Sequence, residues 1–399
     1  MNILMLTLMY PQDQLQEVSA NVKDKLQNQI NSYQRAFVKG IRSNLEESEQ
    51  LDILNCLPVG IFPLQYRKLI LKSGLHDEGS IQQLGCINLP WLKQKWRAFA
   101  AQRAIEKWAE SDPANRTVLV YTQYLPYMQA LHQAKKRFPD LKAAVIVTDL
   151  PSEMGLSSGR KGLLKALEDR MGQRSIALLR QMDGYILLTA PMADALQING
   201  KPTEVIEGLI LSDDAPVPEA SPSSKPFFLY TGTLESSLGI PEMLAAFEEM
   251  PEYELWICGH GSMNAQIEEY ASRCPNIRFF GFVPQQEALT MQASAAALLN
   301  PRQPSGIFTK YSFPSKTLEY MRSGKPVLCC RLEGIPSDYD PYLCYMDEGK
   351  EGIIRSVRSL MRLEQGERIR LGQEAREYVL KHKNPHVQCR KLLSLLRRL

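Results

Sequence analysis

Several features that mark particular protein classes are missing from this 399-residue chain. No apolar run reaches the roughly 18 residues that a membrane-spanning helix needs. The N-terminus is apolar but lacks the basic start and the small-residue cleavage site of a signal peptide, so we expect it to form a buried strand. The net charge of +3 is too small to argue for nucleic acid as a partner. The sequence therefore predicts neither a membrane span nor nucleic-acid binding.

Cysteine and histidine occur in no metal-binding arrangement. The eight cysteines are scattered, with no CxxC pair and no histidine partners at ligand spacing. This distribution predicts reduced thiols, a cytoplasmic location and no structural zinc. A G-x-G-x-x-G segment is also missing, so a nicotinamide or flavin fingerprint is not supported.

Short apolar runs alternate with longer amphipathic stretches, which is the pattern of parallel α/β folds. Hydrophobic residues at 44% and charged residues at 23% are globular values, and the length suffices for two domains. The expected strands are Asn2–Leu8, Leu51–Leu57, Thr117–Tyr121, Ala143–Thr148, Gly184–Leu188, Glu204–Ile206, Phe227–Thr231, Glu254–Cys258, Ile277–Phe280, Ala295–Leu299 and Pro326–Cys330. The expected helices of the first half are Val22–Leu45, Leu92–Glu110, Leu125–Phe138, Leu163–Met182 and Ala190–Gln197.

A linker separates the two expected domains. Residues 209–226 contain four prolines and four serines and little that is apolar. We therefore predict one Rossmann-like domain at 1–208, a second domain at 227–384, and a final Leu/Arg helix at 385–399.

The most informative segment is Tyr311-Ser-Phe-Pro-Ser-Lys-Thr-Leu-Glu-Tyr-Met-Arg-Ser-Gly-Lys-Pro-Val327. Pro314 suits the first position of a helix, because its missing N–H costs nothing there. Ser315 and Lys316 then lie in the first turn, where unpaired N–H groups and the helix dipole attract an anion. Glu319 lies one turn further on the same face, so its carboxylate can meet vicinal hydroxyls beside that anion. Phosphate followed by a ribose diol is the order of groups in a nucleoside diphosphate. The alternative is an ordinary capped helix with a solvated Glu319.

This segment resembles the donor-site helix of family 4 glycosyltransferases. That family has the α/β GT-B fold, in which two facing Rossmann-like domains with parallel sheets enclose a cleft. Five further blocks are similar to the family's and stand in the expected order: Val205-Ile-Glu-Gly208, Tyr230-Thr-Gly-Thr-Leu234, Leu255-Trp-Ile-Cys-Gly-His-Gly261, Phe280-Gly-Phe-Val-Pro284 and Leu298-Leu-Asn-Pro-Arg302. Two departures are visible. Tyr311 stands where the better-known pattern has a glutamate, and Thr231 to Gly239 contains neither the Arg nor the Lys often found there. The resemblance is therefore to a subgroup with a Phe-Pro-Ser-Lys helix.

The resemblance implies a retaining glycosyltransferase of the hexosyl or N-acetylhexosaminyl type. Such an enzyme moves a sugar from a nucleoside-diphosphate donor, with UDP-sugar favoured, to a glycan or lipid-linked acceptor, and surface polysaccharide synthesis is the expected role. The acceptor side would lie in residues 1–208 and the nucleotide sugar in residues 227–384, and the last helix would cross back to the first domain. The resemblance also implies no cofactor and no obligatory metal, which agrees with the absence of an Asp-x-Asp motif.

The implied donor site draws on strand ends and on the 311–327 helix. The donor-binding candidates are Gly232, Thr233, Gly259, Val283, Arg302, Lys310, Ser315, Lys316 and Glu319. A glycine at a strand end lets backbone approach a diphosphate closely, although a tight turn would also use one. Arg302 suits a diphosphate through its bidentate guanidinium, and a salt bridge is the alternative. With Lys316 it is expected to stabilise the leaving diphosphate.

One catalytic candidate lies in the first domain. Asp149 ends a buried strand, and the Gly/Ser-rich stretch 152–162 after it suggests a mobile lid. We expect Asp149 to orient the acceptor, with a helix cap as the alternative. The catalytic candidates are thus Asp149, Lys316 and Arg302.

Residues 91–108 combine tryptophans with bases. One apolar stripe is flanked by five bases and consists of Leu92, Trp96, Phe99, Ala100, Ala104 and Trp108. Contact with an anionic membrane surface is one interpretation and would place the protein at the inner face of the membrane. A core-packed helix with a solvated basic back is the other.

Two further function classes stay open. A nucleotide-sugar 2-epimerase of the same fold would need acid/base residues that face the sugar. A non-catalytic protein that binds nucleotide sugar or partners a transferase is suggested by Tyr311.

Overall fold

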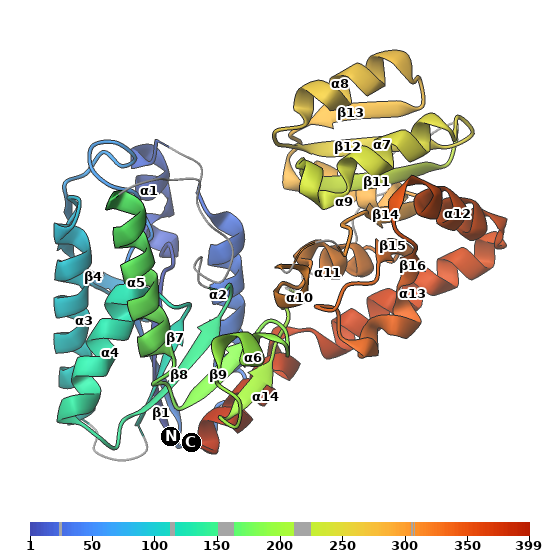
Figure 1. The fold of residues 1–399 in the computed structure, drawn as a ribbon. Helices are drawn as coiled ribbons and strands as arrows, with labels where there is room; N and C mark the ends of the chain where they lie inside the picture. The colour runs from blue at the N-terminus through green and yellow to red at the C-terminus, as the bar shows by residue number, and fades with distance from the viewer. Residues whose placement is uncertain (24–25, 112–115, 151–162, 211–224, 305, 307) are drawn as a thin grey trace. The chain divides into compact units, whose positions relative to one another are not determined.

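The structure is a computed structural model that describes residues 1–399 except 24–25, 112–115, 151–162, 211–224, 305 and 307 (Figure 1). Most of the predicted linker and the predicted lid at 152–162 lie outside the described residues. The chain divides into two compact units, Met1–Leu209 with Pro385–Leu399, and Ile210–Asn384. Among the described residues, no helix combines the length and the apolar character that crossing a bilayer requires.

The first unit is built on an eight-stranded sheet with the order β10-β9-β8-β7-β1-β2-β5-β4. Its strands are β1 (Asn2–Thr7), β2 (Gln50–Asn55), β4 (Gly74–His76), β5 (Ile81–Gln83), β7 (Arg116–Tyr121), β8 (Lys142–Val147), β9 (Gly184–Leu187) and β10 (Thr203–Val205). Neighbours are parallel except β4 and β5. A separate antiparallel pair joins β3 (Ile70–Leu71) to β6 (Cys86–Ile87). The central strands are apolar runs rather than alternating ones, because helices cover both faces of the sheet.

The helices of the first unit include the last helix of the chain. They are α1 (Leu15–Asn21), α2 (Asn28–Arg42), α3 (Leu92–Ser111), α4 (Leu125–Arg137), α5 (Leu163–Leu179), α6 (Met192–Leu196) and α14 (Pro385–Arg397). Ile3 and Met5 of β1 face a core cluster that contains Phe37 of α2 and Leu392 of α14. The side-chain alternation of the strand thus directs one face of the sheet toward α2 and α14. The C-terminal helix therefore contributes to the core of the first unit.

Two parts of the first unit differ from the sequence prediction. The helix expected at Val22–Leu45 is present only from Asn28 to Arg42 as α2, so its predicted start is wrong. Val22 is extended and bridges Tyr66, and Lys23 donates its backbone N–H to the carbonyl of Gln65 at 3.0 Å. Pairing with a distant segment thus outweighs local helical periodicity. The strands β3 to β6 were not predicted, since runs of two or three residues carry no readable alternation.

The second unit has a six-stranded sheet with the order β13-β12-β11-β14-β15-β16, and all its neighbours are parallel. Its strands are β11 (Phe227–Thr233), β12 (Glu254–His260), β13 (Ile277–Gly281), β14 (Ala297–Asn300), β15 (Val327–Cys330) and β16 (Cys344–Met346). Its helices are α7 (Ile240–Glu248), α8 (Asn264–Arg273), α9 (Gln285–Ser294), α10 (Phe308–Tyr311), α11 (Ser315–Arg322), α12 (Gly349–Arg362) and α13 (Gln365–His382). One apolar cluster, drawn from the strands and from α7, α11, α12 and α13, forms its core. The predicted fold class, α/β with two mainly parallel sheets, is confirmed.

Candidate functional site

The second sheet offers a ligand position at the carboxyl ends of β11 and β14. The strand order reverses there, with β12 and β13 on one side of β11 and β14 to β16 on the other. Open α/β sheets bind ligands at such switch points. β11 ends at Thr233, and Arg302 follows the end of β14. Helix α11 packs on β14 and β15, so the predicted phosphate helix belongs to the same part of the sheet.

Lys316 and Glu319 form an ion pair on α11. The Lys316 Nζ lies 3.1 and 3.0 Å from the two carboxylate oxygens of Glu319. The side chains are 30% and 34% exposed, so water and ligands can reach both groups. An ion pair this accessible contributes roughly 0–1 kcal/mol to stability and can be exchanged for ligand contacts at low cost. Lys316 and Glu319 thus lie on one face of α11, as predicted from their spacing, and they are ion-paired with each other.

A buried glutamine holds Glu319 in place. Gln292 of α9 is fully buried, and its amide nitrogen donates to Glu319 Oε1 at 2.7 Å and to Thr231 Oγ1 at 3.2 Å. Its amide oxygen has no hydrogen-bond partner among the described residues. Both amide hydrogens are therefore committed to linking β11 to the carboxylate of α11. Sequence analysis missed Gln292, because its partners lie 27 and 61 residues away and no local pattern marks it.

Tyr320 fixes α11 to β11 directly. Its buried hydroxyl accepts the backbone N–H of Thr231 at 2.8 Å and donates to the Thr231 carbonyl at 3.0 Å. Burial raises the pKa of the Tyr320 phenol, so the hydroxyl stays neutral and keeps its proton for donation. Asn300 of β14 also donates to Thr317 Oγ1 at 3.1 Å. These contacts hold α11 against two neighbouring strands and fix the position of its first turn.

The glycines at the strand ends have a packing role. β11 and β12 run two residues beyond their predicted ends, so Gly232 and Gly259 are paired strand residues rather than turn residues. Gly259 has φ +148°, and a Cβ there would lie 1.8 Å from the Gly232 carbonyl oxygen. Gly239 has φ +77°, and a Cβ there would lie 1.9 Å from the Pro301 oxygen. Gly239 thus lets the loop after β11 approach the segment that carries Arg302.

The remaining basic candidates have partners of their own. Arg302 donates from Nη2 to Ser312 Oγ at 2.7 Å, and burial lowers the pKa of its guanidinium without neutralising it. The Lys310 Nζ lies 3.4 Å from Glu333 Oε2 in an exposed pair. Arg302 is thereby linked to the segment just before α11, whereas Lys310 pairs with the loop after β15.

The other donor candidates lie at the surface or beside the core. Ser315 is exposed as the first residue of α11, and Pro314 is the residue before the helix rather than its first position. Thr233 is exposed and accepts a hydrogen bond from the Tyr230 hydroxyl at 2.7 Å through its carbonyl. Val283 packs against the apolar core between β13 and α9. An exposed first turn is consistent with an anion site on α11.

Asp149 lies in the first unit, two residues after β8. Its side chain is exposed, and its carbonyl accepts the amide of Gln123 at 2.6 Å. Reduced hydration raises the pKa of the Asp149 carboxyl, and a hydrogen bond with Thr148 opposes that shift. The Asp149 carboxyl is therefore accessible to a ligand at the carboxyl end of β8.

The helix predicted at Leu92–Glu110 is present as α3, but the first half of its apolar stripe is not buried. Leu92, Trp96 and Phe99 are 39%, 45% and 61% exposed, so the core-packed interpretation is wrong for them. Trp108 donates from its indole nitrogen to Asp52 at 2.8 Å.

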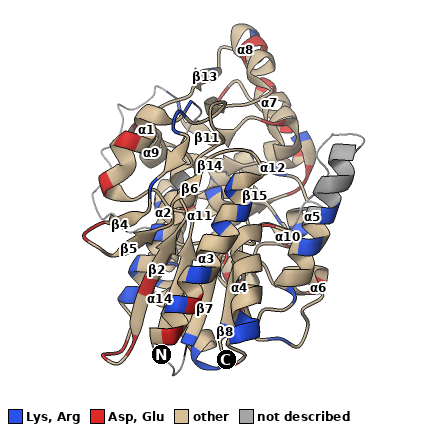
Figure 2. Cartoon of the chain, turned by 90° about the vertical axis from the view of Figure 1, so that its left-hand side faces the viewer, with Lys and Arg blue, Asp and Glu red and all other residues tan. Residues whose placement is uncertain are grey.

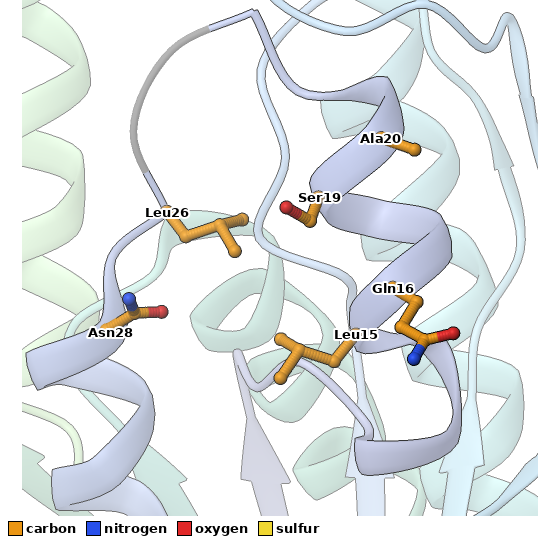
Figure 3. Close-up of a pocket in the computed structure, with 6 residues that line it drawn as sticks. All are labelled: Leu15, Gln16, Ser19, Ala20, Leu26 and Asn28. Atoms are coloured by element: carbon orange, nitrogen blue, oxygen red, sulfur yellow. The ribbon is translucent and has the colours of Figure 1, made fainter.

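An open depression of about 530 Å³ also lies in the first unit (Figure 3). Its walls come from α1 and from the segment that leads into α2. It is lined by Leu15, Gln16, Ser19, Ala20, Leu26 and Asn28. None of the predicted site residues lines it. Among the described residues, no cluster of His, Cys, Asp or Glu could hold a metal ion.

Comparison with known proteins identifies the fold. A sucrose-phosphate synthase from Thermosynechococcus elongatus matches with a TM-score of 0.64 and 15% identity, covering 100% of this chain and 98% of that chain. A trehalose-6-phosphate structure from E. coli, bound with UDP-2-fluoro glucose, matches with a TM-score of 0.64 and 10% identity over 99% of each chain. A glycosyltransferase from Rickettsia africae matches with a TM-score of 0.62 and 11% identity over 100% and 98%. The chain thus has the GT-B fold, as predicted.

The sequence comparison concerns the second unit. Residues 225–362 match the family model described as glycosyl transferases group 1. This range contains β11 to β15 and α11, and with them every donor-binding candidate. No curated protein sequence matches the chain.

Proposed function

We propose that the protein is a retaining glycosyltransferase that moves a sugar from a nucleoside-diphosphate donor to a glycan or lipid-linked acceptor. The observation that carries the proposal is the carboxylate of Glu319, which Gln292 holds at 2.7 Å one turn behind the exposed start of α11. The match of residues 225–362 to group 1 glycosyl transferases supports it. The Phe-Pro-Ser-Lys subgroup is part of the proposal, since Pro314 stands just before that helix and Ser315 begins it.

The first turn of α11 binds the donor diphosphate. The N–H groups of Ser315 and Lys316, the Ser315 hydroxyl and the Lys316 ammonium face an anion at the positive end of the helix. In the donor complex, Lys316 leaves Glu319 for the diphosphate, and Glu319 accepts hydrogen bonds from the two ribose hydroxyls. The ion pair between Lys316 and Glu319 thus opens when the donor binds, and Lys316 contacts the diphosphate while Glu319 contacts the ribose.

Transfer follows from the stabilisation of the leaving group. The bond between the anomeric carbon and the phosphate oxygen breaks, the acceptor hydroxyl bonds to that carbon, and its proton passes to the leaving phosphate. Negative charge grows on the diphosphate in this step, and Lys316 with Arg302 stabilises it without a metal ion. Asp149 orients the acceptor.

UDP-sugars are the favoured donors. A similar structure is bound with UDP-2-fluoro glucose, which makes UDP-hexose and UDP-N-acetylhexosamine the first compounds to test. A role in surface polysaccharide synthesis, in the cytoplasm and in contact with the inner face of the membrane through residues 91–108, completes the proposal.

A donor panel tests the proposal. UDP-, GDP-, ADP- and TDP-sugars are incubated with the protein, and both the free nucleoside diphosphate and the sugar product are measured. Glu319→Gln is the site variant, and Glu351→Gln, which changes an exposed carboxylate on α12, is the matched control. We expect one donor class to be consumed by the wild type and by the control. An epimerised donor sugar would favour a 2-epimerase, and binding without turnover would favour a non-catalytic partner.

A further inference from the structure

Exposed large apolar side chains are concentrated in one part of the first unit. Nine of the thirteen in the described residues lie between residues 64 and 99: Leu64, Leu69, Ile70, Leu75, Leu89, Trp91, Leu92, Trp96 and Phe99. Single exposed apolar residues are normal on a protein surface, but a group of this size marks an interaction site.

Helix α3 shows the anomaly most clearly, because the faces of its first two turns are reversed, whereas further along Ala101, Ile105 and Ala109 are buried. Leu92, Trp96 and Phe99 follow one another at spacings of four and three, so they share a face, and that face is exposed. The opposite face is buried and begins with Lys93 and Arg97. An amphipathic helix that only supported the core would place its aromatic side chains inward.

A second segment joins this face through Asn88. The Asn88 side chain donates to the carbonyls of Gly60 at 3.0 Å and Lys68 at 3.2 Å, and its backbone N–H donates to Leu69 at 2.7 Å. In the β3–β6 pair, Ile70 lies opposite Ile87. These bonds bring the exposed residues of the 64–70 segment beside the start of α3. We call the combined area, formed by residues 64–75 and 89–99, the apolar-basic surface.

Trp91 contributes a strained aromatic residue to this surface. Its φ is +61°, in the left-handed region that bulky residues rarely adopt, and its side chain is 66% exposed. A conformation of this kind costs free energy and occurs most often at functional sites.

The charges that α3 adds to the apolar-basic surface are positive, whereas acids lie beside the 64–75 segment, where Glu17 pairs with Lys68 and where Asp77 and Glu78 follow. The sequence contains no Asp or Glu from residue 53 to residue 76 or from residue 84 to residue 105. The exposed bases in and beside these segments are Arg67, Lys72, Lys95, Arg103 and Lys107. Figure 2 shows Lys and Arg repeated along α3.

We propose that the apolar-basic surface docks on an anionic lipid bilayer, with its exposed aromatic and aliphatic residues in the interface and its bases at the headgroups. Tryptophan suits the boundary between headgroups and acyl chains, and bases are attracted by the negative surface potential. A second copy of the chain fits less well. A two-fold dimer interface over α3 would bring its bases near those of the second copy, and residues 79–105 contain no acid to compensate them. The inference rests on the membrane contact of the proposed function and deepens it, but it does not involve the sugar donor, so vesicle binding can fail while sugar transfer succeeds.

The test compares binding of the full-length protein to phosphatidylcholine vesicles and to vesicles that also contain phosphatidylglycerol. The apolar variant is Trp91→Asn with Trp96→Gln, because Asn tolerates a positive φ and Gln suits a helix. The charge variant is Lys72→Gln with Lys95→Gln. Ile369→Gln, which changes an exposed apolar residue of α13, is the control.

We expect co-sedimentation with the anionic vesicles only, and weaker binding at high salt. Each lost base should weaken binding about fivefold, the equivalent of about 1 kcal/mol. Tryptophan emission should shift to the blue with vesicles, and the apolar variant should lose both the shift and the binding. Ile369→Gln should behave as the wild type.

Three results would overturn the inference. One is equal recovery with neutral and anionic vesicles. Another is full binding by the apolar variant. The third is a dimer in ultracentrifugation that the apolar variant abolishes, which would make the surface a contact between copies of the chain. Thermal melts and nucleoside diphosphate binding of each variant show that the fold and the donor site are intact.

Discussion

Two helices, α3 and α11, show what an amphipathic pattern can and cannot predict. In α11 the residues expected to meet a ligand, Lys316 and Glu319, are accessible, and Tyr320 and Thr317 are buried against the sheet. In α3 the first half of the expected apolar stripe is exposed and two cations are buried.

The difference lies in what each helix packs against. The buried face of α3 meets backbone carbonyls that need donors: Lys93 donates to Val59 and Gly60, and Arg97 donates to Leu57 at 2.5 Å. Unsatisfied buried carbonyls would cost more than exposed aromatic rings, so the cations face inward. Helix α11 also satisfies backbone groups, but it does so with the neutral hydroxyl of Tyr320, which bonds the N–H and the carbonyl of Thr231.

The largest effect is expected on the buried face of α3. Arg97 donates to the Leu57 carbonyl and, at 2.9 Å, to the Tyr124 hydroxyl. Arg97→Met removes one charge-assisted hydrogen bond from the Leu57 carbonyl and one from the part-buried Tyr124 hydroxyl, and should lower the free energy of unfolding of the first unit by about 4 kcal/mol. The control on the opposite face is Trp96→Gln, which should change stability by less than about 0.5 kcal/mol. Chemical denaturation measures both, and equal effects would contradict the reversed faces of α3.

Lys93 should make stability depend on pH. Burial, helped by the nearby charge of Arg97, lowers the pKa of Lys93 to about 8. Between pH 8 and the ordinary lysine pKa near 10.4, Lys93 is protonated in the unfolded chain but neutral in the folded chain. The free energy of unfolding therefore rises with pH in this window. We expect the wild type to gain as much as about 3 kcal/mol relative to Lys93→Met. If the free energies of unfolding of the wild type and of Lys93→Met changed in parallel with pH, the lowered pKa of Lys93 would be contradicted.

On α11, Lys316→Ala should affect turnover more than donor binding. Charge on the diphosphate increases as the glycosidic bond breaks, so the ammonium stabilises the transition state more than the ground state. We expect kcat to fall at least about tenfold with little change in KM. Lys350→Ala, which removes from α12 the ion-pair partner of Glu249, is the matched control and should retain most activity. A raised KM at unchanged kcat would contradict this prediction, because it would show that Lys316 stabilises the bound donor and the transition state equally.

A smaller effect is expected from the residue behind the carboxylate. Gln292→Leu removes the 2.7 Å hydrogen bond to Glu319 but keeps the volume of the buried side chain. Nucleoside diphosphate binding should weaken about fivefold, because one supporting bond to a charged group is lost. Gln292→Leu should also bind the ribonucleotide with a smaller preference over its deoxy form than the wild type does. In the Glu319→Gln variant, Gln292→Leu should weaken nucleoside diphosphate binding little further. If the two substitutions weakened binding additively, Gln292 would not act through Glu319.

The main strands were predictable from the sequence, because buried parallel strands are apolar runs bounded by turn residues. The short strands β3 to β6 and the break between α1 and α2 were not, since distant pairing such as that of Val22 with Tyr66 decides them. In the site, the spacing of Lys316 and Glu319 was readable because a helix fixes it. Gln292, Thr231 and Tyr320 were not, because only the folded sheet brings residues from β11, α9 and α11 together.

The central claim is that Glu319 recognises the ribose of a nucleoside diphosphate. Isothermal titration calorimetry should compare the nucleoside diphosphate chosen by the donor panel with its 2′,3′-dideoxy analogue, on the wild type and on Glu319→Gln. We predict that the wild type binds the ribonucleotide at least about tenfold more tightly than the analogue, because hydrogen bonds to a charged group are lost. Glu319→Gln should bind both equally weakly with an unchanged melting temperature. Equal binding of the two ligands by the wild type, or unchanged affinity in Glu319→Gln, would contradict the account.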